Sequence, residues 1–246
     1  MIQNFKSCGN IILCGEYSLN HGGSGLSLAL KKYNTLEFKQ AKIFEWLING
    51  KSIDDQWSNI IQENLGIGRG LFNFKIDWDE LKCFDYKSSI VSNLCKFHNG
   101  DPRYYLKKYN NINFWTSYLN KSIIYSDNSY SFLDERWQFK DQIYFLPLMN
   151  ENKEPRFCNY QFPTDVLNTY VYRIMRSKTL DEFIAYMDEH DRIISMIIGE
   201  KRLKLDNCKY SKYLGVWGGN FALIIGKNIK DYYPEAISYY DLILEK

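Results

Sequence analysis

The sequence predicts an α+β protein, because strand patterns dominate its first third, helical patterns follow, and strand patterns return later. Apolar residues alternate or form short runs in the strand-like parts, and they recur three or four residues apart in the helix-like parts. Neither an internal repeat nor a linker rich in Gly, Pro or Ser divides the 246 residues. This length suits one large domain or two closely packed lobes.

The first third contains the strand signals. Residues 11–14 form a short apolar run, and residues 26–30 alternate with period two after the polar turn at 20–25. Residues 44–48 precede Asn49-Gly50, a dipeptide typical of hairpins because both residues tolerate a positive φ. We therefore expect mainly strands in this part of the chain.

The helical signals begin in the middle of the chain. Ser88 or Ser89 suits the N-cap of a helix that runs to His98. Asp101 and Pro102 suit the cap and first turn of another helix.

Two further helices and three further strands complete the predicted fold. Thr179 and Glu182 have capping-box spacing and open a long helix, on which His190 is expected to be a satisfied core histidine. The other helix is expected at 165–176, and the strands at 123–125, 142–146 and 221–225.

Charge and cysteine usage exclude several classes of function. The net charge is only +2 and no basic stripe is present, so no nucleic-acid partner is expected. No apolar run reaches the roughly 18 residues of a membrane span, and the first residues lack the apolar centre of a signal peptide, so we expect a cytoplasmic protein without a membrane partner. The cysteines have no C-x-x-C spacing, which predicts reduced, mostly buried thiols and no metal site: Cys8, Cys14, Cys83, Cys95, Cys158 and Cys208.

Residues 8–23 read Cys-Gly-Asn-Ile-Ile-Leu-Cys-Gly-Glu-Tyr-Ser-Leu-Asn-His-Gly-Gly. A strand here delivers a tight glycine turn and an acidic residue, Glu16, to one sheet edge. The segment resembles the opening of the GHMP kinases, a family that includes galactokinase, homoserine kinase, mevalonate kinase and phosphomevalonate kinase. In that family a lysine stands where this chain has Asn10.

Residues 212–221 read Lys-Tyr-Leu-Gly-Val-Trp-Gly-Gly-Asn-Phe. They resemble the Gly-rich third motif of the same kinases, and most of all the bacterial GYDIA subfamily. Gly215, Gly218 and Gly219 would let backbone approach backbone or ligand closely. The resemblance runs from end to end, but only these two terminal segments are specific.

The central motifs depart from the family pattern. The family holds ATP phosphates and magnesium with a glycine- and serine-rich loop that opens a helix. The corresponding stretch here keeps Lys87, Ser88 and Ser89, but it has Asp85 and Tyr86 where glycines are expected. Lysine is a point charge and does not replace a cradle of backbone amides.

A second departure concerns the acid that orients or deprotonates the substrate hydroxyl. Asn113 aligns with the family's catalytic Asp, and asparagine accepts no proton at neutral pH. Together with Asn10 and the altered loop, it argues against ordinary phosphoryl transfer, which depends on positioning and electrostatics.

The resemblance implies two lobes that meet at a cleft. The first, at 1–144, is expected to be similar to ribosomal protein S5, and the second, at 145–246, is expected to be ferredoxin-like. It also implies ATP and Mg²⁺ as cofactors and a small alcohol as ligand in that cleft. Three functions follow: a ligand-binding or regulatory pseudokinase, an active small-molecule kinase using Glu16, Lys87, Ser88 and Ser89 in altered roles, or an enzyme of another class. We rank them in that order. A homo-oligomer or an intact kinase partner fits the first.

Overall fold

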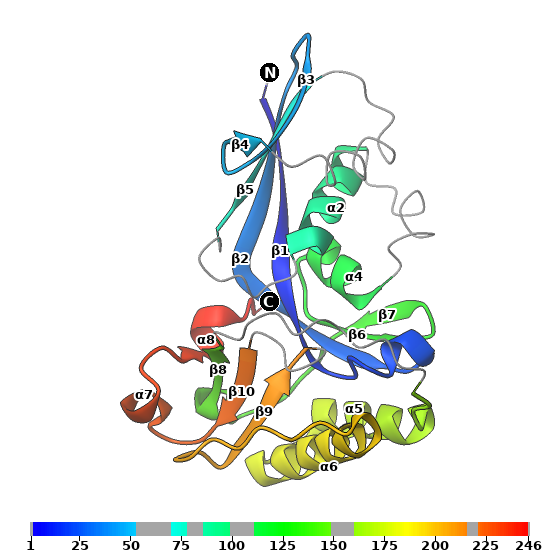
Figure 1. The fold of residues 1–246 in the computed structure, drawn as a ribbon, viewed down its shortest axis with the longest axis vertical. Helices are drawn as coiled ribbons and strands as arrows, with labels where there is room; N and C mark the ends of the chain where they lie inside the picture. The colour runs from blue at the N-terminus through cyan, green and yellow to red at the C-terminus, as the bar shows by residue number, and fades with distance from the viewer. Residues whose placement is uncertain are drawn as a thin grey trace.

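The computed structural model describes residues 2–52, 70–77, 86–98, 111–148, 160–215 and 221–245. Within them the chain forms two sheets, with helices beside each (Figure 1). Strands come first, helices follow and strands return later, as the sequence predicts for an α+β protein. The predicted fold class is confirmed.

The first sheet has seven strands in the order β4-β3-β5-β2-β6-β7, with β1 paired to β2. All its pairs are antiparallel except that of β3 with β5. Its strands are β1 (Ile2–Cys14), β2 (Gly25–Lys39), β3 (Phe44–Ile48), β4 (Lys51–Ser52), β5 (Gly70–Ile76), β6 (Ile123–Ser126) and β7 (Ser129–Phe132).

The second sheet has four antiparallel strands in the order β11-β8-β10-β9. Its strands are β8 (Ile143–Pro147), β9 (Tyr210–Leu214), β10 (Phe221–Ile225) and β11 (Ile237–Ser238). β10 is central and fully buried, as predicted, but the short β11 follows it.

Two pairs of helices accompany the sheets in Figure 1, one beside β1 and β2 and the other beside the second sheet. The first pair is α2 (Tyr86–Phe97) and α4 (Ile112–Leu119), and the second is α5 (Thr164–Arg176) and α6 (Leu180–Ile198). The short helical segments are η1 (Leu19–His21), η2 (Lys140–Gln142), α7 (Ile229–Tyr232) and α8 (Tyr239–Leu242).

Several local predictions can be checked against this geometry. Asn49 and Gly50 have φ values of 48° and 74° and join β3 to β4. The Thr179 side chain accepts the Glu182 backbone N–H, as a capping box requires. The expected cap at Ser88 or Ser89 is wrong, because α2 already begins at Tyr86 and both serines lie in its first turn. The helix expected at Asp101 and Pro102 lies outside the described residues.

The largest hydrophobic core is shared by the two sheets. It joins Leu28 of the first sheet to Leu223 of the second, with Phe183 and Met187 of α6 also contributing. A second core packs α2 against the first sheet around Trp46. β1, α6 and β9 therefore all contribute side chains to the largest core.

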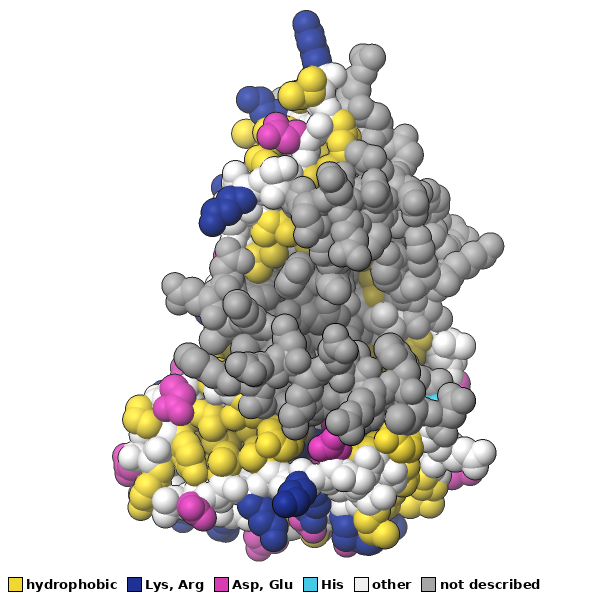
Figure 2. Space-filling model, viewed as in Figure 1, with side chains coloured by type: hydrophobic (Ala, Val, Ile, Leu, Met, Phe, Trp, Pro, Cys, Tyr) yellow, Lys and Arg dark blue, Asp and Glu magenta, His cyan; other side chains and the backbone are white. Residues whose placement is uncertain are grey.

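The described surface has two further properties that bear on function. No described helix is long and apolar enough to cross a membrane. On the face drawn in Figure 2, acidic and basic side chains are interspersed along the lower part, over the lobe that contains α5 and α6.

Candidate functional site

The site begins at the tight turn that follows β1. Gly15 has a φ of 88°, and a Cβ added there would lie 2.2 Å from the backbone oxygen of Ser24. The Ser18 hydroxyl donates to the carbonyls of Gly15 and Ser24, at 3.1 and 3.2 Å. Glycine is required here because the chain turns against its own returning backbone. The turn directs Glu16 toward the second sheet.

Glu16 meets Lys212 of β9 in a buried ion pair. The Lys212 ammonium lies 3.2 Å from Glu16 Oε1, and the two side chains are only 2% and 3% exposed. Burial raises the pKa of the Glu16 carboxyl, against the opposing attraction of Lys212. Burial acts to lower the pKa of Lys212. The carboxylates of Glu16 and Asp191 outweigh this effect of burial, so the pKa of Lys212 is raised. The pair ties the β1 turn to the second sheet.

Further polar groups are buried around this pair. Glu16 Oε2, both ring nitrogens of His190 and the Tyr210 hydroxyl have no hydrogen-bond partner among the described residues. His190 is fully buried on α6, as predicted. The expectation that its ring nitrogens are hydrogen-bonded is wrong among the described residues. Burial, together with the Lys212 charge, holds the pKa of His190 well below its usual value, so the ring is neutral.

A cavity of about 300 Å³ opens beside Glu16, between the β1 turn, the end of α6 and the end of β9. Arg202 crosses one wall, where it pairs with Asp188 and, at 2.8 Å, with Asp191. The principal polar and glycine residues of the lining are Glu16, Tyr17, Asp191, Arg202, Tyr213 and Gly215. Because the Asp191 and Glu16 charges are matched by Arg202 and Lys212, the cavity offers hydrogen-bonding groups rather than a large net charge.

The predicted catalytic positions Asn10 and Asn113 do come together. Asn10 is 4% exposed, and its side-chain Nδ2 donates to the backbone carbonyl of Asn113 at 3.3 Å and to the Ser117 hydroxyl at 3.0 Å. Asn113 lies in the first turn of α4, whose N-cap Asn111 accepts the Phe114 N–H at 2.8 Å. The donor and acceptor groups described in this contact carry no charge. Neutral hydrogen bonds therefore join β1 to α4.

The predicted phosphate-binding serines lie at the start of α2 and are turned into the protein. Ser89 is fully buried and its hydroxyl accepts the Asn34 side-chain N–H at 3.2 Å. Ser88 is 8% exposed, and its carbonyl accepts the Ser92 hydroxyl. Lys87 shares this first turn, and its side chain is outside the described part of the structure, as are Gly218 and Gly219.

The residues predicted to bind ATP and Mg²⁺ are only partly described, because the loop before α2 and the Lys87 side chain lie outside the described residues. The hydroxyls of Ser88 and Ser89 are expected to meet phosphate or magnesium. The Ser89 hydroxyl instead accepts a hydrogen bond from Asn34 of β2 and links α2 to that strand. The described residues contain no group of three His, Cys, Asp or Glu side chains arranged to hold a metal ion. The binding roles of Lys87, Ser88 and Ser89 stay predictions.

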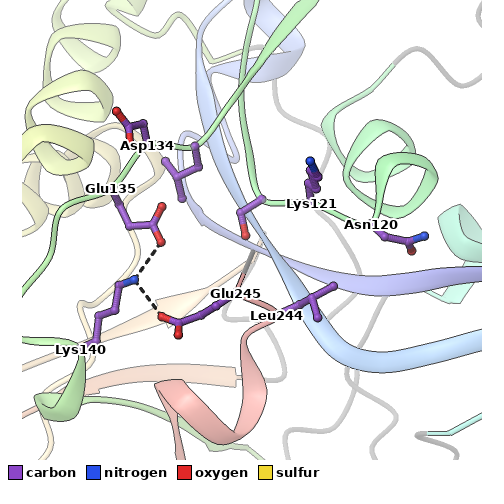
Figure 3. A pocket seen from close by; sticks show the side chains of 9 residues that line it. Asn120, Lys121, Asp134, Glu135, Lys140, Leu244 and Glu245 are labelled. Carbon is purple, nitrogen blue, oxygen red and sulfur yellow. Dashed lines mark hydrogen bonds and ion pairs between the residues drawn. The ribbon is translucent and has the colours of Figure 1, made fainter.

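A second cavity, of about 470 Å³, lies beside the C-terminal segment (Figure 3). In it the Lys140 ammonium bridges the carboxylates of Glu135 and Glu245, at 3.1 and 2.9 Å. The lysine is 15% exposed, and the two carboxylates hold its pKa above the usual value, although burial opposes this shift. Because both carboxylates are engaged by Lys140, we assign this group to holding the C-terminal segment in place.

Comparison with solved structures confirms the fold that the terminal motifs imply. The phosphomevalonate kinase of Streptococcus pneumoniae, in complex with phosphomevalonate and AMPPNP, matches at a TM-score of 0.74 with 12% identity, covering 96% of this chain and 98% of that one. The Methanococcus jannaschii mevalonate kinase matches at 0.69 with 15% identity, covering 100% and 98%. The mevalonate pyrophosphate decarboxylase of Streptococcus pyogenes matches at 0.62 with 9% identity, covering 100% and 97%.

These similarities define the class of fold to which the chain belongs, that of the GHMP kinases. Identities this low show the fold alone. No protein-family model matches the sequence, and no curated protein matches it.

Sequence reasoning identified Glu16 but not its partners. Lys212 is only the first residue of the glycine-rich segment, and neither Asp191 nor Arg202 belongs to a recognisable motif. One signal was available, since Lys212 interrupts the strand 210–214 on the side shared by Tyr210 and Leu214, which are both buried. A charge at an inward position requires a partner, although the pattern does not say which one.

Proposed function

We propose that this protein is a degenerate GHMP-type kinase that binds a small molecule in the cavity beside Glu16 and has lost phosphoryl transfer. The observation that carries the proposal is that the neutral Asn10 side chain, at the position of the family lysine, donates to the backbone carbonyl of Asn113 and to the Ser117 hydroxyl. A lysine and a carboxylate at these two positions would supply positive charge and a proton acceptor. Two amides supply neither, and general-base assistance alone is commonly worth about 10²–10⁴-fold.

The cavity suggests the kind of ligand. Glu16 Oε2 is buried at its wall without a described partner, and an unpartnered buried acceptor costs about 1–3 kcal/mol. A ligand hydroxyl donating to this oxygen would remove that cost. We therefore expect a small polar ligand with hydroxyl groups. The same proposal places the protein in the cytoplasm and nearest the GYDIA subfamily. Its partner is a second copy of this chain or an intact kinase, unless it acts alone.

We expect ATP with Mg²⁺ to bind weakly or not at all. Ligand at one hundred times its Kd would stabilise the fold by about 2.7 kcal/mol, so thermal denaturation is a sensitive assay. The melting temperature should not change when ATP and Mg²⁺ are added at sub-millimolar concentration. A clear, saturable rise at these concentrations would contradict the loss of the phosphate site.

Restoring one catalytic group should not restore activity, because residues that act as a unit have strongly non-additive effects. We expect no phosphate transfer from ATP to mevalonate or related alcohols by the natural protein or by Asn113→Asp. Turnover that appears only when Asn113→Asp, Asp85→Gly and Tyr86→Gly are combined would support decay from an active ancestor. Robust turnover by the natural protein, abolished by Ser88→Ala, would overturn the proposal.

One observation favours an active kinase as the second candidate. Glu16 is a buried carboxylate with a raised pKa at the wall of a cavity, which is the environment of many general bases. Such an enzyme would use Glu16 to take the substrate proton and Lys87, Ser88 and Ser89 to hold ATP. An enzyme of another class is a third candidate, which the similarity of the fold to that of a decarboxylase supports. Glu16→Gln distinguishes the first two, because it removes turnover only in the active kinase.

A further inference from the structure

A third cavity, of about 480 Å³, lies where α5 ends and α6 begins. We call it the α5–α6 groove. Three cationic side chains line it, together with one carboxylate and two tyrosine rings: Arg173, Arg176, Lys178, Glu182, Tyr172 and Tyr186. The groove shares α6 with the cavity beside Glu16, but the two have no lining residue in common. Tyr186 of the groove and Asp191 of the other cavity are five residues apart on this helix, or about 7.5 Å along its axis.

The cations of this groove have no acidic partner in the described structure. Each of the other described arginines forms an ion pair: Arg136 with Asp134, Arg192 with Glu189, and Arg202 with Asp188 and Asp191. Neither Arg173 nor Arg176 does so with a described carboxylate, and the same is true of Lys178. Unmatched positive charge is therefore concentrated in one hollow.

The single carboxylate of the groove is already engaged. Glu182 Oε2 accepts the backbone N–H of Lys178, the residue before the N-cap Thr179 of α6, at 2.9 Å. Three cations face this one carboxylate, so the local excess of positive charge equals the net charge of +2 carried by the whole chain. The position of the arginines in the last turn of α5 suits the helix dipole, but the dipole explains neither Lys178 nor the hollow shape.

The side chains are arranged to accept an anion with an organic part. The Arg173 guanidinium lies 5.6 Å from the centre of the Tyr186 ring, so its face is supported while its N–H groups can still donate at its edge. Tyr172 is 38% exposed and offers a second ring. Guanidinium groups bind phosphoryl oxygens in bidentate fashion, and the volume is that of a small-molecule site.

We propose that the α5–α6 groove binds a phosphorylated small molecule that carries at least two negative charges. Arg173 and Arg176 hold the phosphoryl oxygens, Lys178 adds a third positive charge, and the tyrosine rings contact the organic part. This site is separate from the cavity of the proposed function, and neither proposal depends on the other.

Calorimetric titration with inorganic pyrophosphate tests the site. The natural protein should bind pyrophosphate saturably at constant ionic strength, and Arg173→Gln combined with Arg176→Gln should weaken binding by about tenfold or more. Both arginines are exposed, so the variant should melt at the natural temperature. Arg136→Gln is the matched control, because Arg136 is exposed and lies outside the groove, and it should leave binding unchanged.

Four outcomes would overturn the proposal. The first is no saturable binding at millimolar pyrophosphate, and the second is equal weakening by Arg136→Gln. The third is loss of binding in Lys87→Gln, which would place the anion at the start of α2 instead. The fourth is tighter binding of a hexaglutamate peptide that is also lost in the double arginine variant, which would identify the groove as a protein-docking surface.

Discussion

Lys212 and Glu16 lie almost completely inside the protein, where each charge has lost its hydration. Their mutual attraction repays the desolvation of both only while both are present, and a single remaining charge keeps its full cost. The contact is also the direct polar link between the β1 turn and β9. Its free energy can therefore be tested by removing the partners separately and together.

Lys212→Met keeps much of the side-chain volume but leaves Glu16 without its cation. We expect the free energy of unfolding to fall by about 3–5 kcal/mol at neutral pH, measured by urea denaturation. Without Lys212, burial and the Asp191 charge still raise the pKa of Glu16, and only a backbone hydrogen bond opposes them, so its folded-state pKa stays above the ordinary 4.5. Protonated Glu16 is stable inside the protein, so the loss should shrink as the pH falls from neutral toward 4.5.

The double variant Glu16→Gln with Lys212→Met is the control for this interpretation. It removes both charges and should be more stable than Lys212→Met at neutral pH, because no uncompensated charge remains. A loss in Lys212→Met that does not change with pH, or that is equal in the double variant, would mean that packing rather than charge determines the effect.

For single residues, the sequence indicated which positions are close together only where both positions belong to the family motifs. The proximity of Asn10 and Asn113 followed from the resemblance, because both positions belong to one site in that family. Periodicity placed His190 in the core but could not show whether its ring nitrogens had partners. The presence of partners depends on segments such as β9, which packs against α6 but is distant from His190 in sequence. Hydrogen bonding between distant segments is not encoded in a local pattern.

Among the elements, the turn after β1 has the strictest backbone requirement. Gly15 and Gly22 flank this segment with similar φ values of 88° and 77°. A Cβ on Gly15 would overlap the Ser24 carbonyl, whereas a Cβ on Gly22 would have no atom within 4 Å. The two glycines therefore separate the cost of a positive φ from the cost of a collision.

Gly15→Ala should destabilise the protein far more than Gly22→Ala. The second change carries only the cost of a left-handed backbone, about 1–2 kcal/mol. The first adds displacement of the returning strand and should exceed about 3 kcal/mol in urea denaturation. Equal losses in the two variants would show that the β1 turn relaxes easily and does not fix Glu16.

The sequence predicted the existence of elements better than their ends. The Asn49-Gly50 hairpin and the Thr179 capping box were located correctly because their chemistry is local. β2 runs for 15 residues, well beyond the expected segment 26–30, because pairing with β1, β5 and β6 along its length keeps it extended. The predicted start of α2 is wrong because Ser88 and Ser89, the predicted caps, lie within its first turn.

For the whole molecule, composition and periodicity predicted the α+β class, and the resemblance of the two terminal motifs predicted the particular fold. The division into lobes at 1–144 and 145–246 stays a prediction. Tyr144 lies within β8, and the largest core joins side chains of both sheets. A shared core of this kind favours joint unfolding of the two sheets, because neither can open without exposing it.

The C-terminal segment makes this coupling testable. Ile243 pairs with Leu30 of β2 in an isolated bridge, and the Leu244 N–H donates to the Ala29 carbonyl at 2.8 Å. The preceding α8 packs near β8, and Lys140 holds Glu245. A few residues at the end of the chain thus contact both sheets.

Ile243→Ala should therefore destabilise both sheets by the same amount. Ile243 is 1% exposed, so the cavity left behind should cost about 2–5 kcal/mol. Hydrogen exchange at the amides of β2 and β10 measures each sheet separately, and we expect equal losses of protection. Ile43→Ala is the matched control, because Ile43 is 67% exposed and its truncation should change stability by less than about 0.5 kcal/mol. Loss of protection in one sheet alone would show that the lobes unfold independently despite their common core.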